Sequence, residues 1–167
     1  MSEGFFLKEY NGLKGEFLSC IYEIIQNEKI CEMEGATKHG KVDCFDHCLF
    51  VSYMSFRVCK QLGLDCRSAA RAGLLHDFYL YDKTQENSFK HRTKHPKIAL
   101  ENATECFELS DKEKDIILKH MWPITLEPPR YKESFVVDFM DKYCTYLETT
   151  DSDRLEIIED IKRLISY

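Results

Sequence analysis

His76 and Asp77, an adjacent histidine and aspartate, are the residues of this chain best placed for metal chemistry. They close a run of small and apolar residues. Neighbouring helical side chains point about 100° apart, so both can reach one ion only near a helix end where other ligands converge. Behind His76, at helical spacing, lie Ala69, Ala72 and Gly73, a nearly bare face that lets another helix approach closely. The pair therefore predicts half of a metal site.

Further imidazole and carboxylate groups fall at helix ends or on helix faces that are otherwise apolar; they are His47, His95, His120 and Asp141. A single inward histidine is more often a core residue bonded to a carbonyl group. Burying four histidines and two acids without partners, however, costs several kcal/mol. A divalent ion satisfies all of these groups at once. The mixture of ligands suits iron, manganese, cobalt or zinc better than calcium or magnesium.

The last carboxylate ligand has two candidates. Asp138 and Asp141 lie three residues apart and share one side of an expected helix, so either could complete the site.

The elements that must position these side chains read as helices throughout. Apolar residues recur at intervals of three and four, and glycine, proline and capping residues mark the ends. The expected helices cover 13–33, 43–62, 65 or 68 to 76, a segment from 95 with Pro96 at its first position, a segment opened by the capping box Ser110–Glu113, a segment after 129, and a segment from 151. No alternating segment predicts a strand. The sequence predicts an all-α fold, a single bundle of about seven helices over residues 1–167.

A polar stretch, residues 78–94, separates two of the expected helices. It holds the one dense basic run, 90–94, and several aromatic residues that could cover a flat group, among them Phe78. A loop of this composition can act as a lid or wall a substrate pocket. His39 and His91 fall in loops and are expected to be exposed.

The composition limits the classes of function. A net charge of −6 argues against a broad nucleic-acid-binding face, although a local basic pocket is compatible with it. With 44% apolar and 31% charged residues, and no apolar run near the ~20 residues of a membrane span, the chain reads as a globular protein outside the membrane. The N-terminus lacks a signal-peptide pattern, so we expect a cytoplasmic location. Eight cysteines without a Cys-x-x-Cys pair are expected to be reduced thiols.

Three segments of the chain resemble the HD-domain metal-dependent phosphohydrolases: Asp46-His47-Cys48-Leu49-Phe50-Val51, Ala72-Gly73-Leu74-Leu75-His76-Asp77 and Met140-Asp141-Lys142. In that family a histidine, a His-Asp pair and a distant aspartate on successive helices bind one metal. The resemblance runs from about His39 to Glu148. It favours Asp141 over Asp138 as the last ligand, since Asp141-Lys142 matches the family's Asp-Lys ending.

His95 and His120 resemble the two histidines that small binuclear bacterial members insert between the His-Asp pair and the final aspartate. The resemblance implies two divalent ions bridged by Asp77, with Fe, Mn, Co, Ni, Zn and Mg all left open, as is the choice between one ion and two. Asp77 and His76 are the expected catalytic residues, because either can orient an acidified water. The side chains expected to grip phosphate oxygens are Arg92, Lys94, Lys97 and Lys142.

The residues and the resemblance together favour a metal-dependent phosphohydrolase that acts on a small phosphate ester or a nucleotide. The substrate, the native metal and the oligomeric state do not follow from the sequence. Two alternatives stay open: a non-catalytic HD module that senses a nucleotide or a metal, and a binuclear iron oxygenase on the same helices. The expected partner is a small phosphorylated metabolite, not long nucleic acid or a membrane.

Overall fold

The computed structural model of the protein describes residues 3–33, 37–39, 42–78, 89–150 and 155–165, and this part of the chain is almost wholly helical. The helices are α1 (Glu3–Ile25), α2 (Glu28–Cys31), α3 (Cys44–Gln61), α4 (Cys66–Leu75), α5 (Phe89–Cys106), α6 (Asp111–Lys119), α7 (Lys132–Thr150) and α8 (Leu155–Ile165). Two short strands, β1 (Thr37–His39) and β2 (Val42–Asp43), precede α3. The predicted all-α class is confirmed.

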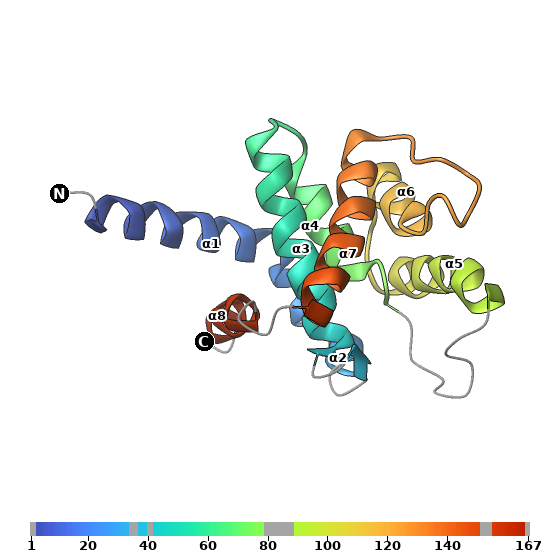
Figure 1. The fold of residues 1–167 in the computed structure, drawn as a ribbon, viewed down its shortest axis with the longest axis horizontal. Coiled ribbons are helices and arrows are strands. Elements are labelled where there is room, and N and C mark those ends of the chain that lie inside the picture. The colour runs from blue at the N-terminus through green and yellow to red at the C-terminus, as the bar shows by residue number, and fades with distance from the viewer. Residues whose placement is uncertain (1–2, 34–36, 40–41, 79–88, 151–154, 166–167) are drawn as a thin grey trace.

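Helices α3, α4 and α7 lie together at the centre of the bundle (Figure 1). Helix α3 packs against α4 and α7, while α6 contacts α4, α5 and α7. Helix α1 contacts α4 and extends away from the bundle toward the N-terminus, and α8 packs near α1 and α3. The helices that carry the predicted ligands are therefore neighbours in space.

The ends of α3, α4 and α6 follow from local sequence signals. Asp43 accepts a hydrogen bond from the Asp46 amide at 2.8 Å, and Asp65 accepts one from the Ser68 amide at 3.0 Å. These side chains satisfy amides that a helix start leaves unpaired. Gly63, with a φ of 66°, adopts the left-handed conformation that follows the end of α3. The predicted limits of these helices and the capping box of α6 are confirmed.

The bare face behind His76 packs closely on α3, as its small residues predict. A Cβ atom placed on Gly73 would lie 3.0 Å from the Cα of Ser52. The Ser52 hydroxyl donates a hydrogen bond to the Ala70 carbonyl at 2.6 Å. Because any side chain at position 73 would meet backbone atoms, glycine sets the separation of α3 and α4.

Helix α5 begins earlier than the sequence predicts. We expected Pro96 at the first helical position and His95 at the N-terminal edge, but α5 starts at Phe89 and Pro96 lies inside it. The φ angle of proline is compatible with a helix, so the helix can continue through it at the cost of one hydrogen bond to the carbonyl four residues earlier. His95 therefore projects from within a helix.

The N-terminal segment also differs from the prediction. The single helix expected over 13–33 is divided: α1 starts at Glu3 and ends at Ile25, and Asn27 caps the separate α2 through a hydrogen bond from the Lys29 amide at 3.0 Å. Strands β1 and β2 pair antiparallel where we expected no strand. With three and two residues, they are too short to show an alternating pattern in the sequence.

The described cysteines are all free thiols, and most of them are buried. Three of them have raised pKa values because burial disfavours the thiolate: Cys20 in α1, Cys144 in α7, and Cys59 in α3, whose pKa rises to about 12. None of the helices in the described part of the chain has both the length and the apolar character that crossing a membrane requires.

A candidate metal centre

The structure brings the six predicted ligands together inside the bundle. His47 comes from α3, His76 and Asp77 from the C-terminal end of α4, His95 from α5, His120 from the end of α6, and Asp141 from α7. All six are buried, with exposed fractions between 0% for His47 and 9% for Asp141. Among the described residues, two groups have ligand atoms within 4.8 Å of one another: His47, His76 and Asp77, and Asp77, His95 and His120.

The first group is completed by Asp141. The Nε2 of His47 lies 3.0 Å from Oδ1 of Asp141, and the Nε2 of His76 lies 3.5 Å from the same oxygen. The Nε2 of His76 is also 3.4 Å from Oδ2 of Asp77. Nitrogen and oxygen atoms this close to one another can share a single ion at about 2.0–2.2 Å.

The second group forms around the other oxygen of Asp77. Its Oδ1 lies 3.3 Å from the Nε2 of His95 and 3.4 Å from the Nε2 of His120. The two Nε2 atoms are themselves 2.8 Å apart. Asp77 thus faces both groups, one oxygen toward each, as a ligand shared by two ions would.

Backbone carbonyls orient two of the imidazoles. The Nδ1 of His76 donates to the Gly73 carbonyl and the Nδ1 of His120 to the Ile117 carbonyl, each at 2.7 Å. Both histidines sit at the C-cap of their helix, where carbonyls are left unpaired by the helix itself. In a neutral imidazole this bond puts the proton on Nδ1 and leaves the lone pair of Nε2 directed at the centre. The donor set therefore fits a divalent metal.

Glu148, which contacts the candidate centre through His47, was missed by the sequence analysis. Both of its carboxylate oxygens lie 2.9 Å from the Nδ1 of His47. Glu148 follows Asp141 by seven residues on α7, which is two helical turns and hence the same face. That spacing was the signal available in the sequence.

The two candidates for the last ligand have different surroundings. Asp138 lies 2.5 Å from the ammonium of Lys142, whereas Asp141 contacts the imidazoles. Burial would raise the pKa of Asp141, but hydrogen bonds from His47 and His76 hold it well below its usual value. Burial raises the pKa of Asp138, and Lys142 only partly opposes that effect. The structure thus places Asp141 with the ligands and Asp138 with a lysine.

Three of the predicted phosphate-gripping residues, Lys94, Lys97 and Lys142, have described side chains, and all three are exposed. Lys94 and Lys97 are exposed on α5, and Lys97 lines a cavity of about 710 Å³ between α5, the end of α6 and residues 124–127. The ammonium of Lys142 is 3.3 Å from the His120 carbonyl, and its side chain is 46% exposed. The side chain of Arg92 lies outside the described part of the structure, as do the side chains of His39 and His91 and all of residues 79–88.

Phe78 does not cover a substrate pocket, although the sequence analysis expected this of it. Its side chain is only 2% exposed and packs in the hydrophobic core, so it cannot wall an open pocket. The reason is that it directly follows Asp77 at the buried end of α4, where the chain is still inside the bundle.

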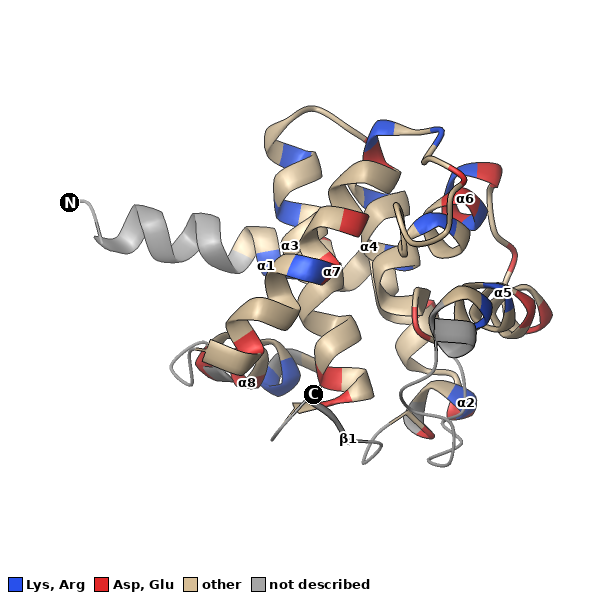
Figure 2. Ribbon diagram, turned by 45° about the vertical axis from the view of Figure 1, so that its right-hand side comes forward, with Lys and Arg blue, Asp and Glu red and all other residues tan. Residues whose placement is uncertain are grey.

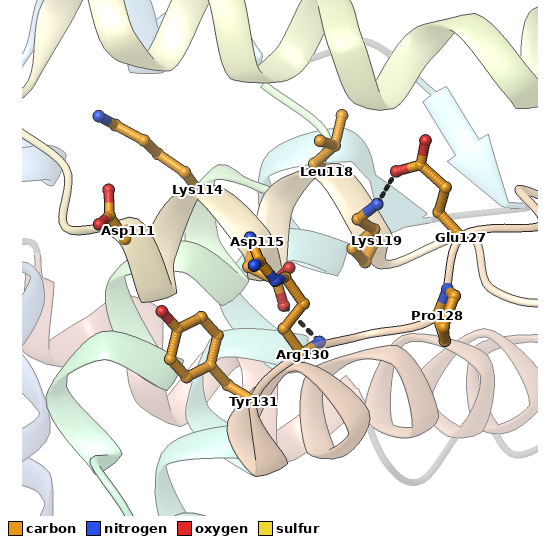
Figure 3. A pocket seen from close by; sticks show the side chains of 9 residues that line it. All are labelled: Asp111, Lys114, Asp115, Leu118, Lys119, Glu127, Pro128, Arg130 and Tyr131. Carbon is orange, nitrogen blue, oxygen red and sulfur yellow. Dashed lines mark hydrogen bonds and ion pairs between the residues drawn. The ribbon is translucent and has the colours of Figure 1, made fainter.

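A cavity of about 990 Å³ between α6 and residues 127–131 (Figure 3) contains none of the predicted ligands. Its wall includes the ion pair between Lys119 and Glu127. Asp115 accepts a hydrogen bond from the Arg130 amide at 2.9 Å in the same wall. These contacts hold the 127–131 segment against α6, so Lys119, Glu127 and Asp115 already have structural partners.

In the view of Figure 2, Lys and Arg alternate with Asp and Glu over the described helices. A bundle of helices whose buried histidines and aspartates can hold divalent ions defines a class of metal-binding α-helical domains. A family model, the HD domain, matches residues 44–146, from the start of α3 to late in α7, and the chain belongs to the HD-domain family. HD domains are commonly metal-dependent hydrolases of a phosphohydrolase superfamily. Comparison with curated proteins and with solved structures finds no match.

Proposed function

We propose that the protein is a metal-dependent phosphohydrolase acting on a small phosphate ester or a nucleotide. The observation that carries the proposal is the position of Asp77, whose Oδ2 faces His76 while its Oδ1 faces His95 and His120. A carboxylate shared between two sets of nitrogen ligands suits a pair of ions held side by side.

The ligands divide naturally between two ions. His47, His76, Asp77 and Asp141 would hold one, and Asp77, His95 and His120 the other. Bound there, divalent ions supply an acidified water and neutralise charge on a phosphoryl group. Asp77 and His76 would orient the attacking water, since both point into the centre. Asp141, with its lowered pKa, is ionised at neutral pH and needs no deprotonation before it binds a cation.

The substrate phosphate would be recognised at the rim of the centre. Lys142 is the best-placed cation, because its ammonium is already held beside the His120 carbonyl and by Asp138 while its side chain stays half exposed. Lys94, Lys97 and Arg92 on α5 are further candidates. A few cations around a buried dication pair suit a small anionic substrate, whereas long nucleic acid requires many phosphate contacts.

The test is a hydrolysis assay on metal-loaded protein. Nucleoside mono-, di- and triphosphates, dinucleoside polyphosphates and sugar phosphates are incubated with protein loaded with manganese, iron, cobalt or nickel. We expect release of phosphate or nucleotide from at least one compound and loss of both metal and activity in Asp77→Ala. Glu133→Gln is the control, since Glu133 is a buried acid on α7 that contacts Lys112 and the Asp65 amide.

The alternatives predict different results. If the fully loaded protein releases nothing from any compound and Asp77→Ala binds the same ligands as wild type, a sensing module replaces the enzyme. Metal-dependent oxygen uptake without hydrolysis would instead support an iron oxygenase.

A further inference from the structure

We propose that Glu148 is a positioning residue that makes the two metal positions unequal, so that the position of His47 and Asp141 fills before the position of His95 and His120. The inference rests on the proposed two-ion centre. It assigns a role to a residue that is not itself a ligand.

The first step is the clamp that α7 places on His47. Asp141 lies 3.0 Å from the Nε2 of this imidazole, and both oxygens of Glu148 lie 2.9 Å from its Nδ1. One helix thus contacts both ring nitrogens from residues two turns apart. The His47 side chain is fully buried and that of Glu148 is 1% exposed, so water does not compete for these contacts.

The second step is the chemistry of the contact at Nδ1. When Nδ1–H donates to Glu148, the lone pair of Nε2 is left for an ion, and a carboxylate acceptor makes the imidazole a stronger donor than a neutral acceptor does. His76 and His120 donate to the neutral carbonyls of Gly73 and Ile117 instead. The Nδ1 of His47 therefore faces a carboxylate, where the Nδ1 atoms of these two imidazoles face neutral carbonyls.

The third step is the distribution of negative charge. Among the described residues, Asp77, Asp141 and Glu148 all lie at or directly behind the first position, while the second position has Asp77 as its carboxylate ligand. Asp138 lies near His120, but its charge is engaged by Lys142 at 2.5 Å. Since a divalent ion is attracted by each added carboxylate, the first position binds more tightly.

The experiment is a titration of metal-free protein with Mn²⁺ and, separately, Co²⁺, followed by calorimetry and by the visible absorption of bound Co²⁺. For wild type we expect two dissociation constants that differ by at least about tenfold. In Glu148→Gln, which keeps the shape but removes the charge, the first dissociation constant rises about 10–100-fold and the second stays nearly unchanged. Glu148→Asp, which keeps the charge, retains part of the first affinity.

The matched control is Glu133→Gln, the same substitution on the same helix, at an acid that contacts no imidazole. Its two dissociation constants should equal those of wild type. The thermal midpoint of each metal-free variant is measured in parallel, because a merely structural Glu148 would lower that midpoint and weaken both ions alike.

Each result decides the matter. The proposal is supported if Glu148→Gln binds the first ion more weakly than wild type, binds the second equally well and shows an altered Co²⁺ spectrum. It is overturned if the binding of both ions is weakened equally, or if the binding of neither is weakened. Two equal constants in wild type overturn the filling order and leave the proposed two-ion centre intact, whereas a wild type that binds no ion overturns the centre itself.

Discussion

Asp77 is the residue on which the two halves of the centre depend. Its two oxygens face different imidazole groups, and its neighbour His76 is held by the carbonyl of Gly73. Adjacent residues can serve one centre because α4 ends at this point and side chains from other helices converge there. Replacing Asp77 should therefore weaken the binding of both ions, whereas replacing a single imidazole should weaken the binding of one.

We predict that His95→Ala retains about one ion and Asp77→Ala retains almost none. The reason is that the first position receives no ligand from α5, while both positions need Asp77. Elemental analysis after dialysis against excess Mn²⁺ and desalting measures the stoichiometry. Lys94→Ala, next to His95 but exposed, is the control and should match wild type. If His95→Ala holds as much metal as wild type, the second position is wrongly assigned.

Helix limits were predictable wherever short-range signals set them. Asp43, Asp65 and Ser110 cap their helices within three residues, so α3, α4 and α6 were found from the sequence. The start of α5 was misplaced because Pro96 is a start signal that the helix overrides. The inward histidines could be found from helical spacing, but the pairing of Glu148 with His47 spans 101 residues and depends on how α7 lies on α3.

The close approach of α3 and α4 gives a second prediction. Gly73→Ala should lower the free energy of unfolding by about 1–3 kcal/mol, because its Cβ would meet the backbone of Ser52 at 3.0 Å and the helices must move apart. Urea denaturation of metal-free protein measures this. Gly12→Ala is the matched control: position 12 in α1 has no atom within 4 Å of an added Cβ, so alanine should stabilise by roughly 0.5–1 kcal/mol. Unchanged stability of Gly73→Ala would contradict the packing.

The centre links most of the bundle. Its six candidate ligands belong to α3, the end of α4, α5, the end of α6 and α7. These elements are spread along the chain between residues 44 and 150. Without an ion, the packed carboxylates and imidazoles are held by hydrogen bonds such as that between His47 and Asp141. Each ion of the proposed pair would replace several of these bonds and would join three segments, with Asp77 at the end of α4 common to both. Metal binding and folding stability should therefore be coupled.

We accordingly predict that divalent metal raises the thermal midpoint of the whole domain. An ion that binds only the folded state, present at 100 times its dissociation constant, adds about 2.7 kcal/mol, which corresponds to a rise of roughly 5–10 °C for a chain of this size. Thermal unfolding with EDTA and with Mn²⁺ measures the difference. Asp77→Ala should show almost no rise, and Ca²⁺, which prefers six to eight oxygen ligands, should give little in wild type. A rise of equal size in Asp77→Ala would mean that the ion binds elsewhere, and equal midpoints with EDTA and Mn²⁺ in wild type would exclude a metal centre at these residues.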